Sequence, residues 1–131
     1  MNPEIKKKFL DGLRSGEFTQ CQNRLVRHNI GSKTAYCILG VLGALYNKEH
    51  EKEPINLDKL SHLPKKVAIW AGLNEAKVIL KCRTNKEISP FVEEVDVFID
   101  SPNNCDKKTL AELNDAGWSF EDLANIIEEE L

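Results

Sequence analysis

The segment Thr-Ala-Tyr-Cys-Ile-Leu-Gly-Val-Leu-Gly-Ala-Leu-Tyr occupies residues 34–46 and contains no charged residue. A helix formed here would be apolar on every side, so the rest of the fold must enclose it. The segment therefore predicts a central helix. Gly40 and Gly43 lower its helix propensity, and we expect them to let a neighbouring helix come close. Four side chains should be largely buried: Leu39, Val41, Leu42 and Leu45.

An amphipathic helix is predicted at the N-terminus. Asn2 can cap it, Pro3 suits its first position, and Gly16 ends it. Apolar residues recur between these signals at helical spacing, namely Ile5, Phe9, Leu10 and Leu13.

The C-terminal segment predicts a helical hairpin. A first helix over residues 109–116 ends at Gly117, and Ser119 caps a second helix, with Asp122 at the capping-box distance. Trp118 and Phe120 are expected to be packing residues in this hairpin.

The first part of the middle region gives less regular signals. Residues 17–33 are polar and have no clean period, so we expect a loop or a frayed helix there. Pro64 can open a helix that ends at Gly72. A short helical turn is suggested before it by Leu57, Leu60 and Leu63, and the Pro64 helix should contribute to the core through Val67, Ile69 and Trp70.

Residues 77–83 and 91–99 are rich in β-branched and aromatic residues and predict a small β-hairpin, with a helix over 75–82 as the alternative. Residues 101–104 should form a loop. The chain as a whole predicts an α+β, mostly helical fold in a single globular domain over residues 1–131. In that fold the N-terminal helix and the C-terminal helical hairpin wrap the central apolar helix.

Composition limits the class of protein. Hydrophobic residues make up 41% of the chain and charged residues 30%, which is typical of a globular domain and too apolar for a disordered one. No apolar run approaches the roughly 18 residues that a membrane span needs, and no apolar signal stretch follows the N-terminus. We therefore expect a cytoplasmic protein that binds neither a membrane nor a cofactor.

The four cysteines, Cys21, Cys37, Cys82 and Cys105, include no Cys-x-x-Cys pair and no histidine at a zinc-finger offset. Because a cytosol keeps scattered thiols reduced, we expect all four to be unpaired and metal-free.

Charge is distributed unevenly along the chain. Residues 1–33 hold seven Lys and Arg against three Asp and Glu, whereas residues 106–131 hold two Lys against eight Asp and Glu. The basic N-terminal part could bind an anion and the acidic C-terminal part could bind a basic protein, although solvent-exposed helix faces carry similar charge.

A weak phosphate-binding signal precedes the central helix. Gly31-Ser32-Lys33-Thr34 is similar to the end of a phosphate-binding loop, but the required glycine spacing and preceding strand are missing. A helix start with free N–H groups and nearby basic residues could still hold a phosphate or carboxylate. The candidate anion-binding residues are Arg24, Arg27, His28, Lys33 and Thr34. Ordinary capping by Ser32 or Thr34 is the simpler explanation of the same pattern.

Two other classes of function find little support. Residues 110–127 look like the opening of a helix-turn-helix domain, but the chain then ends in Glu128, Glu129 and Glu130, which would repel phosphate. We therefore expect no nucleic-acid binding. For catalysis, the sequence presents no nucleophile with a base, no carboxylate pair and no metal triad, so we assign no catalytic residue.

Four segments are informative together. They are Phe-Leu-Asp-Gly-Leu-Arg-Ser-Gly-Glu-Phe-Thr-Gln at 9–20, Tyr-Cys-Ile-Leu-Gly-Val-Leu at 36–42, Trp-Ala-Gly-Leu at 70–73, and residues 110–127. In these segments the chain resembles small proteins of no settled function encoded by tailed bacteriophages and prophages. The family often has cysteine where Ile38 and Gly43 stand here, which argues against a cysteine-based site. The resemblance implies an origin and a fold, and it carries over no catalytic residues.

These observations leave three functional hypotheses. The first is an accessory phage or prophage protein that binds and modulates a host protein or assembly without catalysis. The second is a binder of a small anion or nucleotide, a phosphate-bearing small molecule held by the basic region 24–34. The third is an enzyme whose site assembles only in the fold, and a deep pocket joining a histidine to a cysteine or carboxylate would favour it. The oligomeric state is not indicated.

Overall fold

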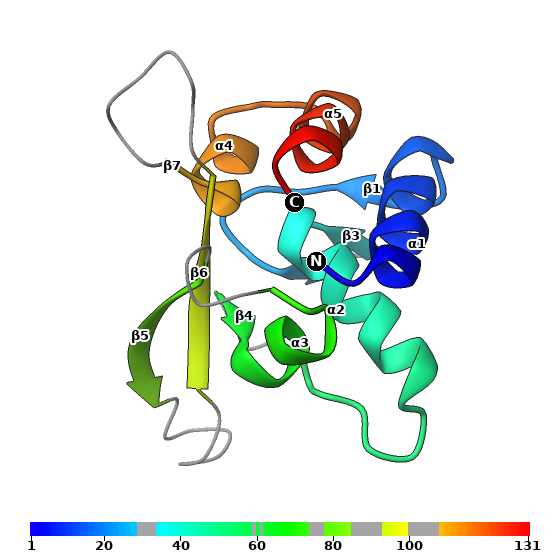
Figure 1. Cartoon of the computed structure of the whole chain (residues 1–131). Helices are drawn as coiled ribbons and strands as arrows, with labels where there is room; N and C mark the ends of the chain where they lie inside the picture. The colour runs from blue at the N-terminus through cyan, green and yellow to red at the C-terminus, as the bar shows by residue number, and fades with distance from the viewer. Residues whose placement is uncertain (29–33, 59, 61, 74–77, 85–92, 100–107) are drawn as a thin grey trace.

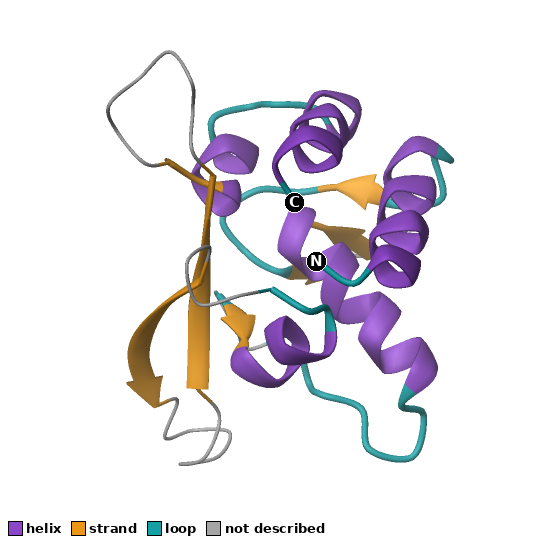
Figure 2. Cartoon of the chain, in the orientation of Figure 1, coloured by secondary structure: helices purple, strands orange, loops and turns teal. Residues whose placement is uncertain are grey.

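The computed structural model describes residues 1–28, 34–58, 60, 62–73, 78–84, 93–99 and 108–131. Within these residues, five helices lie beside two small sheets, so the fold is α+β and mostly helical, as predicted (Figures 1 and 2). The longest strands, β5 and β6, form the left edge of the view in Figure 1, and the helices lie to their right.

Helix α1 (Pro3–Arg14) forms as its sequence predicts. The Asn2 side chain accepts a hydrogen bond from the Glu4 N–H at 3.0 Å, which satisfies one of the free donors of the first turn. The helix ends at Ser15, and Gly16 follows in a left-handed conformation with φ 75°. Its predicted apolar residues are buried, namely Ile5, Phe9, Leu10 and Leu13.

Helix α2 (Ile38–Glu49) begins four residues later than predicted. Residues Thr34–Tyr36 form strand β3 instead, which pairs in parallel with β1 (Thr19–Gln20) and antiparallel with β2 (Val26–His28). Hydrogen bonds to two strands outweigh the helix propensity of these three residues, which include only one strong helix former, Ala35. The expectation of a loop or frayed helix over 17–33 missed both strands, because two or three residues are too short to show an alternating pattern.

The central position of α2 is confirmed. Leu39, Val41 and Leu42 are buried, whereas Leu45 is only half-buried. The prediction that its glycines let a neighbouring helix come close is wrong, because their close contacts are made with connecting segments. A Cβ added to Gly40 would meet the Leu25 carbonyl group, and one added to Gly43 would meet the Leu57 side chain.

A two-residue strand, β4 (Leu63–Pro64), precedes helix α3 (Lys65–Trp70), which starts after Pro64 as expected. Of the short helical turn predicted through Leu57, Leu60 and Leu63, one hydrogen bond forms, from the Leu60 N–H to the Leu57 carbonyl at 3.2 Å, whereas Leu63 pairs with Val95 of β6. Val67 is buried, but Ile69 is 67% exposed and does not join the core, contrary to the prediction.

Strands β5 (Val78–Thr84) and β6 (Glu93–Ile99) form an antiparallel pair, with Val78 opposite Val97 and Thr84 opposite Glu93. This confirms the predicted hairpin and excludes the helical alternative over residues 78–82. A short strand, β7 (Lys108–Thr109), pairs with β6. The loop predicted at 101–104 lies outside the described residues.

The C-terminal helical hairpin is confirmed by α4 (Leu110–Asp115) and α5 (Phe120–Glu130). Thr109 and Glu112 form a capping box at the start of α4, and Ser119 caps α5 by accepting from the Asp122 N–H at 3.1 Å. The two termini lie close together in Figure 1, where the Met1 ammonium donates to the Leu131 carbonyl at 3.3 Å. None of the described helices is long and apolar enough to cross a membrane.

Candidate functional site

Of the five residues predicted to bind an anion, the four that the structure describes do not converge on a helix start. Arg27 and His28 lie in β2, and Thr34 lies opposite His28 in β3. Arg24 is exposed in the segment before β2. Lys33 lies outside the described residues.

The first turn of α2 is buried and its N–H groups already have partners. The Ile38 N–H donates to the Asn114 Oδ1 at 3.1 Å, and the Gly40 N–H donates to the Cys37 Sγ at 3.4 Å. The premise that basic residues meet free N–H groups at this helix start is therefore wrong. Anion binding by the basic residues themselves stays a prediction.

The side chain of Asn114 is fully buried and forms hydrogen bonds with several other segments of the chain. Besides accepting from Ile38, its Oδ1 accepts from the Gln20 Nε2 at 2.8 Å, while its Nδ2 donates to the Cys21 carbonyl at 2.8 Å. A weaker contact joins Nδ2 to Asp115 at 3.3 Å. The side chain thus connects α4 to β1 and to the start of α2. Sequence reasoning missed it, because its partners lie 76 to 94 residues away.

Thr34, His28 and Asp58 form a hydrogen-bonded series. The His28 Nδ1 lies 3.2 Å from the Thr34 Oγ1, and its Nε2 lies 2.7 Å from the Asp58 Oδ1. A hydroxyl, an imidazole and a carboxylate in series are the groups of a hydrolytic triad. The side chains of His28 and Asp58 are 59% and 53% exposed, however, so water competes for every bond in the series. This series ties the segment around Asp58 to β2 and β3, and its open setting does not favour an enzyme.

Cys21 and Cys37 are buried, free thiols. Burial raises the pKa of Cys37 to about 12 and also raises the pKa of Cys21. Both thiols therefore stay protonated at neutral pH, which makes them poor nucleophiles. The side chains of Cys82 and Cys105 lie outside the described part of the chain. Over the part that is described, no three His, Cys, Asp or Glu residues gather as a metal ion would need.

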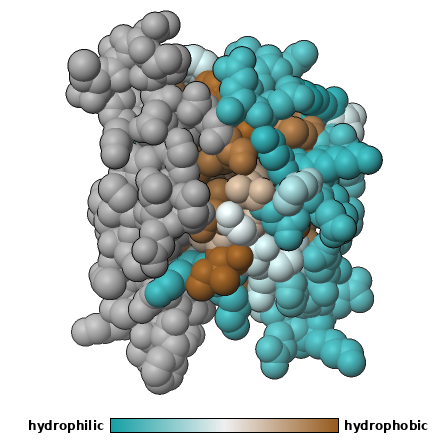
Figure 3. Space-filling model, in the orientation of Figure 1, coloured by the Kyte–Doolittle hydropathy of each residue, from teal (hydrophilic) through white to brown (hydrophobic). Residues whose placement is uncertain are grey.

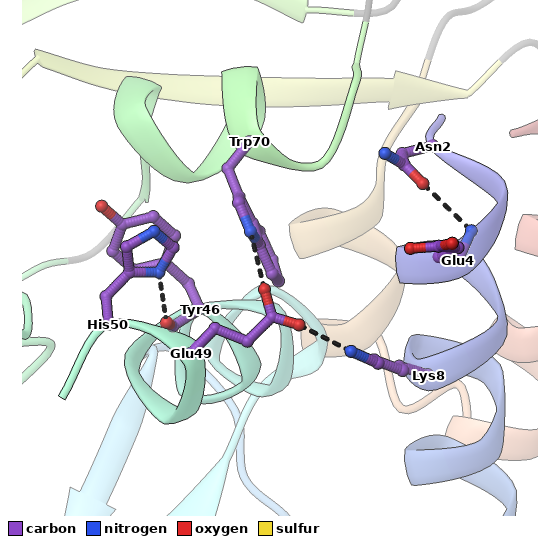
Figure 4. A network of polar contacts seen from close by, with 7 residues as sticks. All are labelled: Asn2, Glu4, Lys8, Tyr46, Glu49, His50 and Trp70. Carbon is purple, nitrogen blue, oxygen red and sulfur yellow. Dashed lines mark hydrogen bonds and ion pairs between the residues drawn. The ribbon is translucent and has the colours of Figure 1, made fainter.

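Figure 4 shows how Glu49, at the end of α2, joins three helices. Its Oε1 accepts from the Lys8 Nζ of α1 at 2.6 Å, and its Oε2 accepts from the Trp70 Nε1 of α3 at 3.1 Å. The hydrogen bond from Lys8 lowers the pKa of Glu49, and the same bond raises the pKa of Lys8. Since both partners are partly exposed, the pair contributes only modestly to stability.

Three aromatic rings lie next to this carboxylate. The His50 ring stacks on Tyr46 with centroids 3.9 Å apart, and Trp70 meets Tyr46 edge-on at 5.4 Å. The His50 Nδ1 lies 2.8 Å from the Tyr46 carbonyl, which can only accept, so Nδ1 carries a proton. The rings contact one another and leave no room for a cation between them. We interpret the cluster as a clamp between α2 and α3 and not as an aromatic cage.

The basic N-terminal helix lies against the acidic C-terminal helix. Arg14 contacts the Glu128 carboxylate at 2.8 Å and Asn125 at 3.0 Å, and Lys6 donates to the Glu128 carbonyl at 3.0 Å. The hydrogen bond from Arg14 lowers the pKa of Glu128. The side of the molecule on which α1 lies, to the right in Figures 1 and 3, is mostly hydrophilic. The two oppositely charged ends of the chain therefore partly neutralise each other.

An acidic surface remains at the turn between α4 and α5. We call residues 115–122 the acidic turn, in which every residue except Phe120 is exposed. Trp118 is 43% exposed, so it does not pack as predicted, whereas Phe120 does. Trp118 and Ile69 are the two large exposed hydrophobic residues in the part of the chain that the structure describes. One feature of the sequence could have indicated that Trp118 is exposed. It lies in the turn between two predicted helices and not on the apolar face of either.

None of the described ion pairs involves the acidic turn. These pairs join Lys8 to Glu49, Arg14 to Glu128, His28 to Asp58 and Lys48 to Glu17. Two of the three carboxylates in the turn interact with residues outside it. Glu121 interacts electrostatically with Arg14, and Asp115 accepts a hydrogen bond from the Asn23 N–H at 2.8 Å. The turn thus presents an aromatic ring and net negative charge to solvent.

Comparison with known protein families gives a match over the whole chain. Residues 1–131 match DUF8296, a domain of unknown function. The chain belongs to this family. No curated protein and no solved structure matches the DUF8296 chain described here. Membership of a family of unknown function agrees with the resemblance noted from the sequence, and it assigns no activity to any residue.

Proposed function

We propose that this DUF8296 chain is a non-catalytic accessory protein, of phage or prophage origin, that binds and modulates a host protein or assembly in the bacterial cytoplasm. The observation that carries the proposal is the exposed Trp118 within the acidic turn. Tryptophan is among the residues most often found at the centre of protein interfaces, where its burial supplies much of the binding energy.

Exposure alone does not select Trp118, because single exposed hydrophobic residues are common and Ile69 is exposed further. The difference lies in the charge nearby. Ile69 follows Lys65 and Lys66 in α3, whereas Trp118 is flanked by Asp115, Glu121 and Asp122. A ring among carboxylates suits a basic segment of a partner, because an arginine or lysine can interact with both.

The proposal is tested by affinity capture from a bacterial lysate with three baits. Wild-type protein and the Ile69→Ala control should retain the same partner, and Trp118→Ala should lose it. The retained protein is then purified and titrated against each bait. We expect Trp118→Ala to weaken binding by about thirtyfold, the effect of losing about 2 kcal/mol at an interface hot spot.

Two results would count against this function. If wild-type bait retains nothing beyond an unrelated bait of the same charge, the binding hypothesis fails. If a partner is retained equally by the Trp118→Ala bait, a partner exists but the acidic turn does not bind it. A partner that dissociates at high salt from wild-type bait would support the charge argument.

The second hypothesis, a small-anion or nucleotide binder, has a specific observation in its favour. Arg27 lines a surface hollow together with residues of β1 and the segment after it.

A further inference from the structure

A hollow of about 370 Å³ lies over the sheet formed by β1, β3 and β2. It is separate from the acidic turn and is lined by Thr19, Gln20, Cys21, Gln22, Asn23, Arg27 and Ala35. We refer to it as the Arg27 hollow. Its volume is at the lower end of the range for small-molecule sites, roughly 300–1,000 Å³.

The pairing of the strands explains why a hollow forms here. Ala35 of β3 is paired with Thr19 on one side and with Arg27 on the other. Residues directly opposite one another in a sheet point to the same face, so these three side chains form one row. The middle member has only a methyl group, so the hollow forms between Thr19 and Arg27, with the buried Ala35 at its floor.

Among the described residues, Arg27 is the single charged one that lines the hollow. Its guanidinium makes one long hydrogen bond, from Nη2 to the Gln22 carbonyl at 3.4 Å, so most of its donors have no partner among the described residues. The Cys21 thiol adds no negative charge, because burial raises its pKa and the nearby Arg27 charge opposes that shift only in part.

The remaining polar side chains can donate hydrogen bonds without adding charge. Thr19, Gln22 and Asn23 are exposed, and the structure gives their side chains no hydrogen bond within its described part. The Gln20 amide nitrogen is already used by Asn114 and by the Trp118 carbonyl, at 2.8 and 2.7 Å. One cation surrounded by neutral donors is the arrangement that a small oxyanion requires.

One carboxylate lies close to the hollow without lining it. Asp115 accepts hydrogen bonds from the Asn23 N–H at 2.8 Å and from the Asn114 side chain at 3.3 Å. Its charge is held in place by these donors, and it opposes an anion at Arg27. Binding should therefore be weak, in the millimolar range that corresponds to about 4 kcal/mol.

We infer that the Arg27 hollow binds a small, hydrophilic molecule with a single oxyanion, either a phosphate or a carboxylate. The guanidinium holds the oxyanion, and the side chains of Thr19, Gln22 and Asn23 hydrogen-bond its remaining oxygens. None of the described residues that line the hollow is aromatic and could stack on a base, so a nucleotide would gain little over its phosphate alone.

The test is a set of amide NMR titrations with inorganic phosphate, acetate and ribose 5-phosphate. The variant is Arg27→Gln, and the matched control is Arg24→Gln, because Arg24 is also exposed, lies in the adjoining segment and is not among the residues that line the hollow. Wild type and the control should show saturable shifts at residues 19–23 and 35. Arg27→Gln should lose at least about tenfold in affinity, since its charge-assisted hydrogen bonds are gone.

The three probes separate the sources of the oxyanion. Phosphate binding more tightly than acetate identifies a phosphate site, and the reverse order identifies a carboxylate site. Tighter binding of ribose 5-phosphate than of phosphate supports contacts from the neutral side chains. The inference is overturned if no probe gives saturable shifts at these residues, or if Arg24→Gln weakens binding as much as Arg27→Gln. An unchanged spectrum of unliganded Arg27→Gln verifies that the variant is folded.

Discussion

Replacing Gly40 and Gly43 by alanine, one at a time, tests how α2 is enclosed. Both glycines lie inside the same helix, and each replacement gains roughly 1 kcal/mol of helix propensity. Because this gain is common to the two variants, the difference between their stabilities reports what surrounds each position.

At Gly40 the surrounding group is backbone. A Cβ would overlap the Leu25 carbonyl oxygen and lie 2.8 Å from its carbon, and this oxygen accepts the Cys37 N–H at 3.0 Å. The segment before β2 must move to make room for the Cβ, and this movement breaks the hydrogen bond from the Cys37 N–H to the Leu25 carbonyl. Overpacking costs about 1–3 kcal/mol, and the unpaired groups cost about 1–3 kcal/mol more. After the gain in propensity, we expect Gly40→Ala to lose about 1–5 kcal/mol.

At Gly43 the surrounding group is the far end of a side chain. A Cβ would lie 2.9 and 3.0 Å from the two methyl carbons of Leu57, which can rotate away. The strain of that movement is comparable to the propensity gain, so Gly43→Ala should stay within about 1 kcal/mol of wild type.

Urea denaturation followed by circular dichroism measures both variants. The midpoint of Gly40→Ala should fall below that of Gly43→Ala at an unchanged m-value, by an amount equivalent to about 1 kcal/mol or more. Equal midpoints for the two variants would refute the backbone contact at Gly40.

Four further perturbations follow from the core and its charges. Asn114→Leu should lose about 2–6 kcal/mol, because two buried backbone groups lose their partner; a loss below about 1 kcal/mol in denaturation would show that water replaces the amide. Leu42→Ala, at a fully enclosed site, should cost about 2–5 kcal/mol, and an unchanged melting temperature would contradict that enclosure. Iodoacetamide at pH 8 should label Cys37 far more slowly in the folded than in the denatured protein, since burial raises its pKa to about 12; equal rates by peptide mass spectrometry would contradict this. The hydrogen bond from Lys8 lowers the pKa of Glu49, so its stabilisation is present above the pKa of the unfolded carboxyl and is lost as pH falls through the lower folded value. Glu49→Gln should therefore flatten the acid limb of the stability curve, and an identical limb in both proteins would count against the ion pair.

The helices whose signals are local could be predicted from the sequence. Asn2, Pro3 and Gly16 mark the limits of α1 through chemistry confined to a few residues, and Ser119 does the same for α5. The burial of Leu42 followed from the absence of charge in its segment. The β5–β6 hairpin was predicted from the β-branched and aromatic content of two neighbouring stretches.

The positions that the sequence did not reveal depend on partners in other segments. Thr34–Tyr36 became a strand because two preceding segments pair with it, and the Ile38 N–H of the following helix was taken up by Asn114. The basic residues thereby lost the helix start that the sequence assigned to them, and Arg27 was placed across Ala35 from Thr19.

The surface properties were decided in the same way. The sequence determined that the chain is basic at one end and acidic at the other, but the packing of α1 on α5 decided that Arg14 and Glu128 cancel while the acidic turn does not. The packing of the chain also leaves the hydrophobic side chains of Trp118 and Ile69 exposed to solvent. Hydrophobicity and charge are properties of a residue, whereas exposure and ion pairing depend on which other segments lie against it, and that is settled only when the whole chain has packed.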